Sequence, residues 1–278
     1  MRGGFRGLFP GPGMGGMHHK AVPMLISYEH EFIFIHCRKT GGSSIMTRLA
    51  PCLGPDDILT GGWREAVRQG IAPNRRAWID FIDTAGGWRS LQALPRNFDS
   101  HIPVSQLLKA VSRATGTRLR PYFDTDPAHP SAREIRDFDP DAWNRFFKFC
   151  FVRNPYERVV SDYLWRRHVE TEAFSFSDFL EDMTRPPRDR RFAHVNADNW
   201  DMYTLNDEIA VDAVGRFENL NQDFSAILDR IGLYRPDDSM PHVKKSGTYD
   251  YRSFYTEEAV ETVSSLFRKE IACFGYCF

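Results

Sequence analysis

The sequence lacks any apolar run long enough to cross a membrane as a helix. Such a helix needs roughly 18 or more consecutive apolar residues, and the apolar runs of this chain, such as FIFI at 32–35, are much shorter. The start, MRGGFRGLFPGPGMGGMHHK, is rich in glycine and proline and lacks the apolar core, about 7–15 residues long, of a secretory signal. We therefore expect a protein without a membrane anchor that works in the cytoplasm, with residues 1–23 as a disordered tail.

The chain also lacks an excess of charge of either sign. Its 36 lysines and arginines balance 37 aspartates and glutamates, for a net charge of −1. Nucleic-acid-binding domains carry basic stripes or patches, so we expect no nucleic-acid partner, and a bound anion would need a few placed basic side chains. With 42% hydrophobic and 14% aromatic residues, the chain can bury a sizeable core, and we expect a single domain over residues 24–278. The oligomeric state does not follow from the sequence.

Cysteines are few and have no zinc-like spacing. The five cysteines are an odd number. Cys37 and Cys150 lie in or beside apolar strands, where cysteine packs as a small hydrophobe. A disulfide or metal pair of Cys273 and Cys277 is disfavoured, and we expect no bound metal.

Apolar runs that alternate with helical patterns predict an α/β layer fold. The predicted strands are Met24–Ile35, Phe147–Val152 and Val211–Phe217. The predicted helices are 43–49, 104–115, 131–136, 139–146, one opened by Asn154-Pro155, 175–183, 219–231 and 256–274. Residues 54–105, rich in glycine and tryptophan, are predicted to be an irregular insertion in which the acceptor substrate is selected.

A strand followed by HCRKTGGSS, residues 36–44, has the composition of an anion site. The N-terminus of the helix that follows carries unpaired N–H groups and a partial positive charge. Gly41 and Gly42 let the backbone approach a ligand closely, Ser43 and Ser44 add hydroxyl donors, and Lys39 adds a mobile positive charge. The alternative is a polar turn after a buried strand.

A second strand-to-helix switch carries Arg153-Asn154-Pro155, and Ser161 follows two turns into the helix. Arginine suits fork-like recognition of a phosphate, although a strand-end arginine more often pairs with a carboxylate. The two switches together indicate a ligand with two separated phosphates. It is not the triphosphatase pattern G-x-x-x-x-G-K-[ST], because Lys39 precedes the glycines.

These motifs resemble those of one enzyme family. FIFIHCRKTGGSSI resembles the 5′-phosphosulfate-binding motif of carbohydrate sulfotransferases, and FKFCFVRNPYERVVSDYLW resembles their 3′-phosphate-binding motif. HPSAREIR, VGRFENLNQDFSAI, PHVKKS and the closing FGYCF are similar to further blocks, so the resemblance covers roughly residues 30–278. The chain is thus similar to the sulfotransferase family 2-like proteins, which include Golgi carbohydrate sulfotransferases and soluble bacterial relatives.

The resemblance implies a P-loop NTPase-like three-layer fold with a central, mainly parallel sheet flanked by helices. It implies 3′-phosphoadenosine 5′-phosphosulfate as the donor, no metal, and a hydroxyl of a carbohydrate or glycoconjugate as the acceptor. It assigns the 5′-phosphosulfate to Lys39, Thr40, Gly41, Gly42, Ser43 and Ser44, and the 3′-phosphate to Arg153 and Ser161. Lys39 would stabilise charge on the oxygen that bridges to the leaving 5′-phosphate, by analogy with phosphoryl transfer. Lys245 and Ser246 either close over the nucleotide or form a solvated basic turn.

A sugar hydroxyl is a poor nucleophile and needs a base, most often a histidine. The resemblance places His129, ahead of SAREIR, at the position of the family's histidine in that block, so we expect it to be the base. The alternative is a histidine that caps a turn containing proline. His101 is the second candidate, His36 is expected to be structural, and Glu134 could orient the base or the acceptor.

Three other features of the sequence have less specific interpretations. We expect Arg216 and Glu218 to form internal ion pairs that support the sheet. Residues 165–167, WRR, face either an anionic sugar or, more commonly for such a run, solvent. Cys37-Arg38 stands where the family commonly has a hydrophobic residue and a proline, a departure with no explanation at the level of sequence.

Two other functions compete with sulfuryl transfer. An ATP-dependent small-molecule kinase is disfavoured by the missing triphosphate-loop order and by the lack of an evident magnesium-binding aspartate after a strand. A catalytically inactive nucleotide-binding protein of the same fold would be favoured by loss of Lys39 or of a usable base, and neither is lost.

Overall fold

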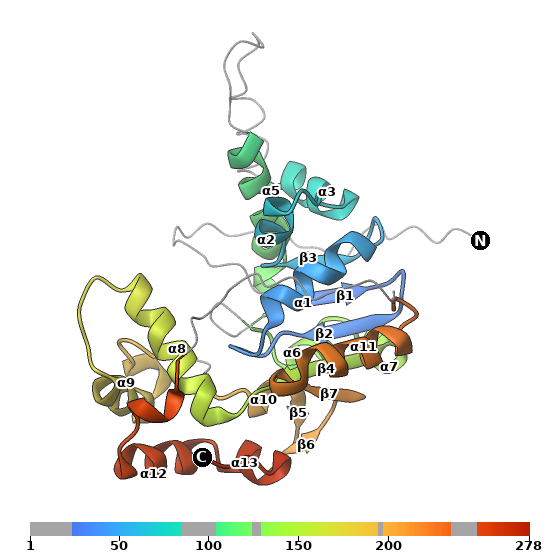
Figure 1. Cartoon of the computed structure of the whole chain (residues 1–278). Coiled ribbons are helices and arrows are strands. Elements are labelled where there is room, and N and C mark those ends of the chain that lie inside the picture. The colour runs from blue at the N-terminus through green and yellow to red at the C-terminus, as the bar shows by residue number, and fades with distance from the viewer. Residues whose placement is uncertain (1–23, 85–103, 124–128, 194–196, 235–248) are drawn as a thin grey trace.

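A five-stranded sheet in the order β3-β1-β2-β4-β7 lies at the centre of the computed structural model (Figure 1). The structure describes residues 24–84, 104–123, 129–193, 197–234 and 249–278. The expectations for the tail 1–23, for His101, and for Lys245 and Ser246 fall outside these residues.

The first predicted strand is wrong: it is a hairpin of two strands, β1 (Met24–Ser27) and β2 (Phe32–Ile35). The polar residues 28–31 form the turn between them. The buried carboxylate of Asp57 holds this turn by accepting hydrogen bonds from the Ser27 hydroxyl at 2.6 Å and from the Tyr28 N–H at 2.7 Å. β2, β4 (Phe147–Val152) and β7 (Ala213–Arg216) are parallel neighbours, whereas β1 runs antiparallel to both β2 and β3 (Ile58–Thr60). Four of the five strands therefore point the same way.

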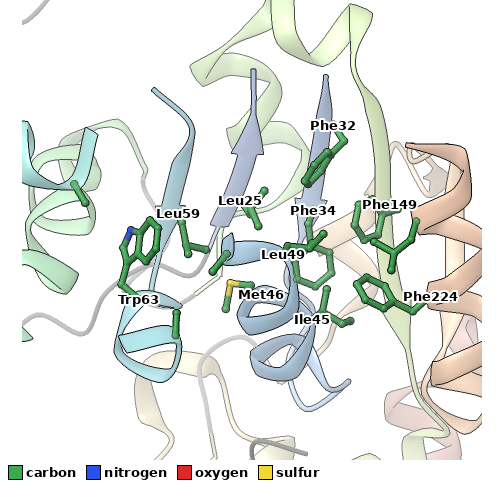
Figure 2. Close-up of a cluster of buried hydrophobic side chains, with 14 of the residues drawn as sticks. Leu25, Phe32, Phe34, Ile45, Met46, Leu49, Leu59, Trp63, Phe149 and Phe224 are labelled. Carbon is green, nitrogen blue, oxygen red and sulfur yellow. The ribbon is translucent and has the colours of Figure 1, made fainter. Parts of the chain in front are cut away.

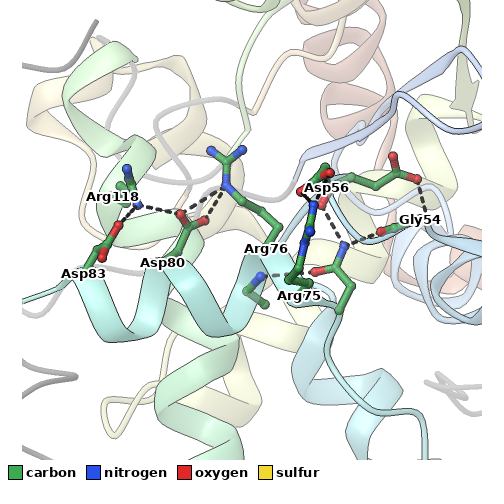
Figure 3. A network of polar contacts seen from close by, with 10 residues as sticks. Gly54, Asp56, Arg75, Arg76, Asp80, Asp83 and Arg118 are labelled. Atoms are coloured by element: carbon green, nitrogen blue, oxygen red, sulfur yellow. Dashed lines mark hydrogen bonds and ion pairs between the residues drawn. The ribbon is translucent and has the colours of Figure 1, made fainter. Parts of the chain in front are cut away.

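Residues 54–84 are not irregular, in contrast to the prediction. They form β3, α2 (Trp63–Arg68) and α3 (Arg75–Asp83). These elements are short, and their sequence is rich in glycine and tryptophan. Trp63 of α2 is only 1% exposed and belongs to the core. Asp80 of α3, which is fully buried, accepts from Arg76 and from Arg118 of α5 (Val104–Leu119), as Figure 3 shows. This network fixes α3 against α5.

The other predicted elements are confirmed with small changes at their ends. They are α1 (Gly42–Leu49), α5, α6 (Ala132–Phe138), α7 (Pro140–Arg145), β4, α8 (Pro155–Val169), α9 (Phe176–Thr184), β7 and α11 (Leu220–Arg230). The last predicted helix is two helices, α12 (Glu257–Leu266) and α13 (Arg268–Phe274), which meet at Phe267. Short elements that the sequence did not indicate are α10 (Trp200–Tyr203), β5 (Thr204–Leu205), β6 (Glu208–Ile209) and single 3₁₀ turns.

The sheet has a hydrophobic cluster on each face, because side chains alternate along its strands. Phe34 of β2 and Phe149 of β4 point to the face covered by α1, α2, α3, α5 and α11, as Figure 2 shows for this cluster. Ile35 and Cys150 point to the opposite face, which α6, α7 and α10 cover. The predicted α/β fold, with a central, mainly parallel sheet flanked by helices, is thus confirmed.

A third cluster lies beside the sheet, where α8 packs against α9 and α12 (Figure 1). It is rich in aromatic side chains, among them Tyr163, Phe176 and Phe179. Because α8 starts at the end of β4 and reaches into this cluster, it connects the edge of the sheet to the third cluster. Among the described helices, none combines the length and the apolar character that crossing a bilayer requires.

Candidate functional site

Three loops meet at the carboxyl ends of the parallel strands β2, β4 and β7, the edge at which open α/β sheets bind ligands. Arg153, just after β4, donates from Nη1 to the carbonyl of Lys39 in the loop after β2, at 3.3 Å. Its guanidinium carbon lies 4.0 Å from the centre of the Phe217 ring, in the 3₁₀ turn after β7. The backbone N–H of Asn154 donates to Glu218 of the same turn at 2.6 Å. The two predicted anion-binding units are therefore in direct contact.

The loop after β2, residues 36–41, which we call the lysine loop, contains two residues in the left-handed conformation. Lys39 has a φ of 62° and Gly41 a φ of 84°, both in the left-handed region. The Thr40 hydroxyl donates to the Cys37 carbonyl at 2.9 Å and so closes the turn. Within the described part of the chain, the N–H groups of Thr40, Gly41 and Gly42 have no acceptor. They lie at the N-terminus of α1, where an anion is favoured.

The two glycines have reasons that the sequence did not reveal. A Cβ on Gly42 would lie 1.7 Å from Cδ2 of His36, so the His36 ring packs directly on this Cα. A Cβ on Gly41 would lie 3.2 Å from Cδ2 of Phe217, and its positive φ also disfavours a side chain. Packing against His36 therefore requires glycine at position 42, and close approach of a ligand at this position stays a prediction.

Arg38 explains the unusual Cys37-Arg38 pair. Its backbone N–H donates to Oδ1 of Asn199 at 3.0 Å, and Nδ2 of Asn199 donates back to the Arg38 carbonyl at 2.9 Å. Its guanidinium binds Asp162 of α8 at 2.5 Å, and all three residues are buried. The turn before Lys39 is therefore held by side chains from two distant segments.

Trp165 and Arg166 of α8 lie at the site instead of on a solvated face, which corrects the more common interpretation of WRR. Nζ of Lys39 lies 5.8 Å from the centre of the Trp165 ring, and the guanidinium carbons of Arg38 and Arg166 lie 5.5 Å and 5.2 Å from it. Burial and the nearby charge of Arg38 lower the pKa of Arg166. Arg167, by contrast, is exposed. The helical spacing of Ser161, Asp162 and Trp165 could have indicated one face of α8 turned toward the lysine loop.

Arg153 and Ser161, the predicted ligands of a second phosphate, are both buried. Arg153 pairs with Glu157, one turn further along α8, at 2.5 Å, which is the carboxylate pairing that a strand-end arginine commonly shows. Its Nε is buried and has no hydrogen-bond partner among the described residues. The Ser161 side chain is 3% exposed. Their role toward a phosphate stays a prediction.

His129 lies against the lysine loop, as expected for a residue of the site. Its Nδ1 is 2.7 Å from the carbonyl oxygen of His36, and the two imidazole rings are 4.8 Å apart. A carbonyl only accepts, so Nδ1 carries the proton and Nε2 carries the lone pair. Burial, reinforced by the charge of Arg38, lowers the pKa of His129 to about 3, so the ring is neutral at physiological pH.

Two other residues differ from their predicted roles. Glu134 accepts from the N–H and the hydroxyl of Ser131 and forms the capping box of α6. Arg216 and Glu218 form no ion pair with described residues, contrary to the prediction. Arg216 donates to the carbonyl of Phe274, and Glu218 accepts from Asn154. They attach the C-terminal segment and the start of α8 to β7.

No three His, Cys, Asp or Glu side chains of the described residues gather in a way that could hold a metal ion. A family model described as the sulfotransferase family matches residues 22–276. This chain belongs to the sulfotransferase family. It is therefore a transferase whose lysine loop, Arg153 loop and His129 lie at one edge of the sheet.

Two individual proteins are similar to this sulfotransferase. A sulfotransferase crystal structure from Alicyclobacillus acidocaldarius aligns with 89% of this chain and 96% of its own, at 17% identity and a TM-score of 0.41. An uncharacterized protein of Archaeoglobus fulgidus is 30% identical over 111 residues, which are 38% of this chain and 83% of that protein.

Proposed function

We propose that this sulfotransferase transfers a sulfuryl group from 3′-phosphoadenosine 5′-phosphosulfate to a hydroxyl of a carbohydrate or glycoconjugate. The observation that carries the proposal is the direct contact of the lysine loop with Arg153, which joins two cationic switches at one sheet edge. The donor has two separated anionic groups, which would match this pair of switches. The reaction would take place in a reducing cytoplasm, which suits the free thiols of the exposed Cys273 and Cys277.

The residues present fit the donor. The N–H groups of Thr40, Gly41 and Gly42 need acceptors that the described residues do not supply. Together with Lys39 and the hydroxyls of Ser43 and Ser44, they would hold the 5′-phosphosulfate. The 3′-phosphate would be held by Arg153, whose buried Nε still has bonding capacity, and by Ser161. Lys245 and Ser246 stay part of the proposal on the strength of the sequence alone.

Each residue would have a simple task in the transfer. The acceptor oxygen forms a bond to sulfur while the bond from sulfur to the 5′-phosphate oxygen breaks, and the acceptor's proton moves to Nε2 of His129. Lys39 and the loop N–H groups stabilise the charge on the leaving phosphate. At a pKa of about 3 His129 is a weak base, but the negative charge of a bound donor raises the pKa of a nearby imidazole. The contact of Nδ1 with the His36 carbonyl supports this role, because it favours the tautomer with the lone pair on Nε2.

A transfer assay tests the proposal. The purified protein, a ³⁵S-labelled donor and a panel of polysaccharides, glycosides and simple alcohols should give labelled product with at least one carbohydrate. Lys39→Ala should lower kcat by about 10²–10³-fold, the effect of removing one charge-stabilising group. Lys269→Ala is the matched control, because Lys269 is an exposed lysine paired with Asp207. Labelling of no carbohydrate, or equal activity of the two variants, would overturn the proposal.

A further inference from the structure

Two buried side chains, Asp162 and Asn199, bond to Arg38 of the lysine loop, and we call these three residues the Arg38 clamp. Asn199 pairs with both backbone groups of Arg38, as a neighbouring strand would, at 3.0 Å and 2.9 Å. Asp162 binds the Arg38 guanidinium through Nη2 at 2.5 Å and through Nε at 3.3 Å. Asn199 is 0% exposed, so its two bonds to the Arg38 backbone are formed without competition from water.

The clamp is attached to rigid parts of the molecule. Asn199 directly precedes α10, whose Trp200 and Tyr203 are buried in the cluster beneath the sheet. Asp162 is the neighbour of Ser161 on α8. The clamp therefore connects the lysine loop to the sheet face and to α8, the helix that carries Ser161.

The residue after Arg38 needs such support. Lys39 is not glycine, yet its φ is 62°, a conformation that is unfavourable for an ordinary residue and persists only where the surroundings impose it. On the N-terminal side of Lys39, the bonds of the clamp fix both the N–H and the carbonyl of Arg38. The Lys39 carbonyl is fixed in turn by Arg153 at 3.3 Å.

We propose that Asn199, acting with the Arg38–Asp162 pair, is a positioning residue that holds Lys39 in its left-handed conformation and the N–H groups of Thr40, Gly41 and Gly42 in place. The consequence for transfer rests on the proposed function. The claim that the clamp orders the lysine loop is independent of the proposed function. Displacing a reacting group by about 1 Å can cost roughly 10²-fold in rate, so the clamp would act mainly on kcat.

The test compares Asn199→Ala with Asn74→Ala in the full chain. Asn74 is a matched control because its side chain also makes two donor bonds, to Gly54 and Asp57 at 2.8 Å and 2.9 Å, and accepts from Ala77 at 3.2 Å. It lies beside the hairpin turn, at the opposite end of β2 from the lysine loop. Hydrogen exchange is measured on the peptide that covers residues 36–44, and kcat is measured for transfer.

In Asn199→Ala we expect exchange of the N–H groups of Cys37 and Ser44 in the loop peptide, which donate to the carbonyls of Ile35 and Gly41, to rise at least tenfold, and kcat to fall about 10²-fold. Asn74→Ala should change neither after correction for its folded fraction. Asn199→Asp keeps the acceptor for the Arg38 N–H and should recover part of both losses. Equal exchange of the loop peptide in the two alanine variants would overturn the proposal.

A second pair of variants covers the case in which Asn199→Ala does not fold. Asp162→Asn removes the charge that holds Arg38, and Asp80→Asn makes the same change in the buried network of α3. Only Asp162→Asn should speed exchange of the loop peptide. Equal exchange in Asp162→Asn and Asp80→Asn would contradict the proposed role of the clamp. A wild type that transfers no sulfate but shows the exchange difference would refute the proposed function and leave the clamp intact.

Discussion

His129 is the single residue whose state most affects the proposed chemistry. Its Nδ1–H is occupied by the His36 carbonyl, which leaves Nε2 as the basic atom. Its burial and the charge of Arg38 depress its pKa to about 3, well below the value of about 6.5 for a free histidine. The folded protein therefore resists protonation at this position, and the unfolded chain does not.

This difference predicts how stability depends on pH. Because the unfolded chain binds the proton first, the contribution is complete above about pH 6.5 and is lost as pH falls toward 3. At pH 5 the loss is about 2 kcal/mol in the free energy of unfolding. Urea unfolding at pH 7.5 and pH 5 should show this loss in the wild type and not in His129→Gln.

His168→Gln is the matched control, because His168 is an exposed histidine of α8. It should keep the pH dependence of the wild type. If His129→Gln lost as much stability between the two pH values as the wild type, His129 would not be the group that causes the pH dependence.

The individual residues of the site were predicted unevenly. The lysine loop, Arg153 and Ser161 could be picked from local motifs and His129 from the family resemblance, and the structure brings the lysine loop, Arg153 and His129 together at one sheet edge. The clamp could not be picked, because Arg38 meets Asp162 and Asn199 across 124 and 161 residues of sequence. Contacts of that range leave no local pattern.

Among the elements, the strand–loop–helix unit from β2 to α1 is the one that defines the site. Its geometry depends on the contact of the His36 ring with the Cα of Gly42, where a Cβ would lie 1.7 Å from the ring. Gly42 is the first residue of α1 and does not have a positive φ. Only packing, and not backbone conformation, therefore requires glycine there.

Gly42→Ala should accordingly destabilise the protein by about 1–3 kcal/mol, the usual cost of overpacking, although alanine is the better helix former. Removing the ring should cancel the clash, so the double variant His36→Ala, Gly42→Ala should be more stable than the sum of the single effects. Chemical denaturation of the four proteins measures this coupling. Strict additivity would show that the ring and Gly42 are not in contact.

Helix starts were predicted well because caps are local. Ser131, Asn154 and Ser175, at the predicted helix starts, each accept a hydrogen bond from a first-turn N–H group. The β1–β2 hairpin was missed because its turn, YEHE, contains none of the glycine, proline or asparagine that marks most turns. Asp57, thirty residues beyond Ser27, supplies the missing turn-forming bonds instead.

At the scale of the whole molecule, one buried ion pair joins segments that border the site. Arg158 of α8 binds Glu270 of α13 at 2.6 Å and donates to the carbonyl of Ala197 at 2.7 Å. The Tyr203 hydroxyl donates to the other oxygen of Glu270 at 3.0 Å. α8, α10 and α13 are thus joined by one polar cluster. Ala197, which accepts from Arg158, lies two residues before Asn199 in the sequence.

Glu270→Ala should cost about 3–5 kcal/mol of unfolding free energy, because it leaves the charge of Arg158 buried without its partner. The adjacent Lys269→Ala removes only an exposed pair with Asp207 and should cost less than about 1 kcal/mol. Urea titrations of both variants provide the comparison. Similar losses in the two would mean that the buried pair does not hold α13 against α8.

The most direct measurement of the central claim is calorimetric titration of the protein with adenosine 3′,5′-bisphosphate, the product that the proposed donor leaves behind, and with ATP and Mg²⁺. The two cationic switches in contact through Arg153 and Lys39 predict tight binding of the bisphosphate and at least tenfold weaker binding of ATP. Lys39→Ala and Arg153→Ala should each weaken binding of the bisphosphate. Binding of ATP with dependence on Mg²⁺, and none of the bisphosphate, would contradict the proposed function.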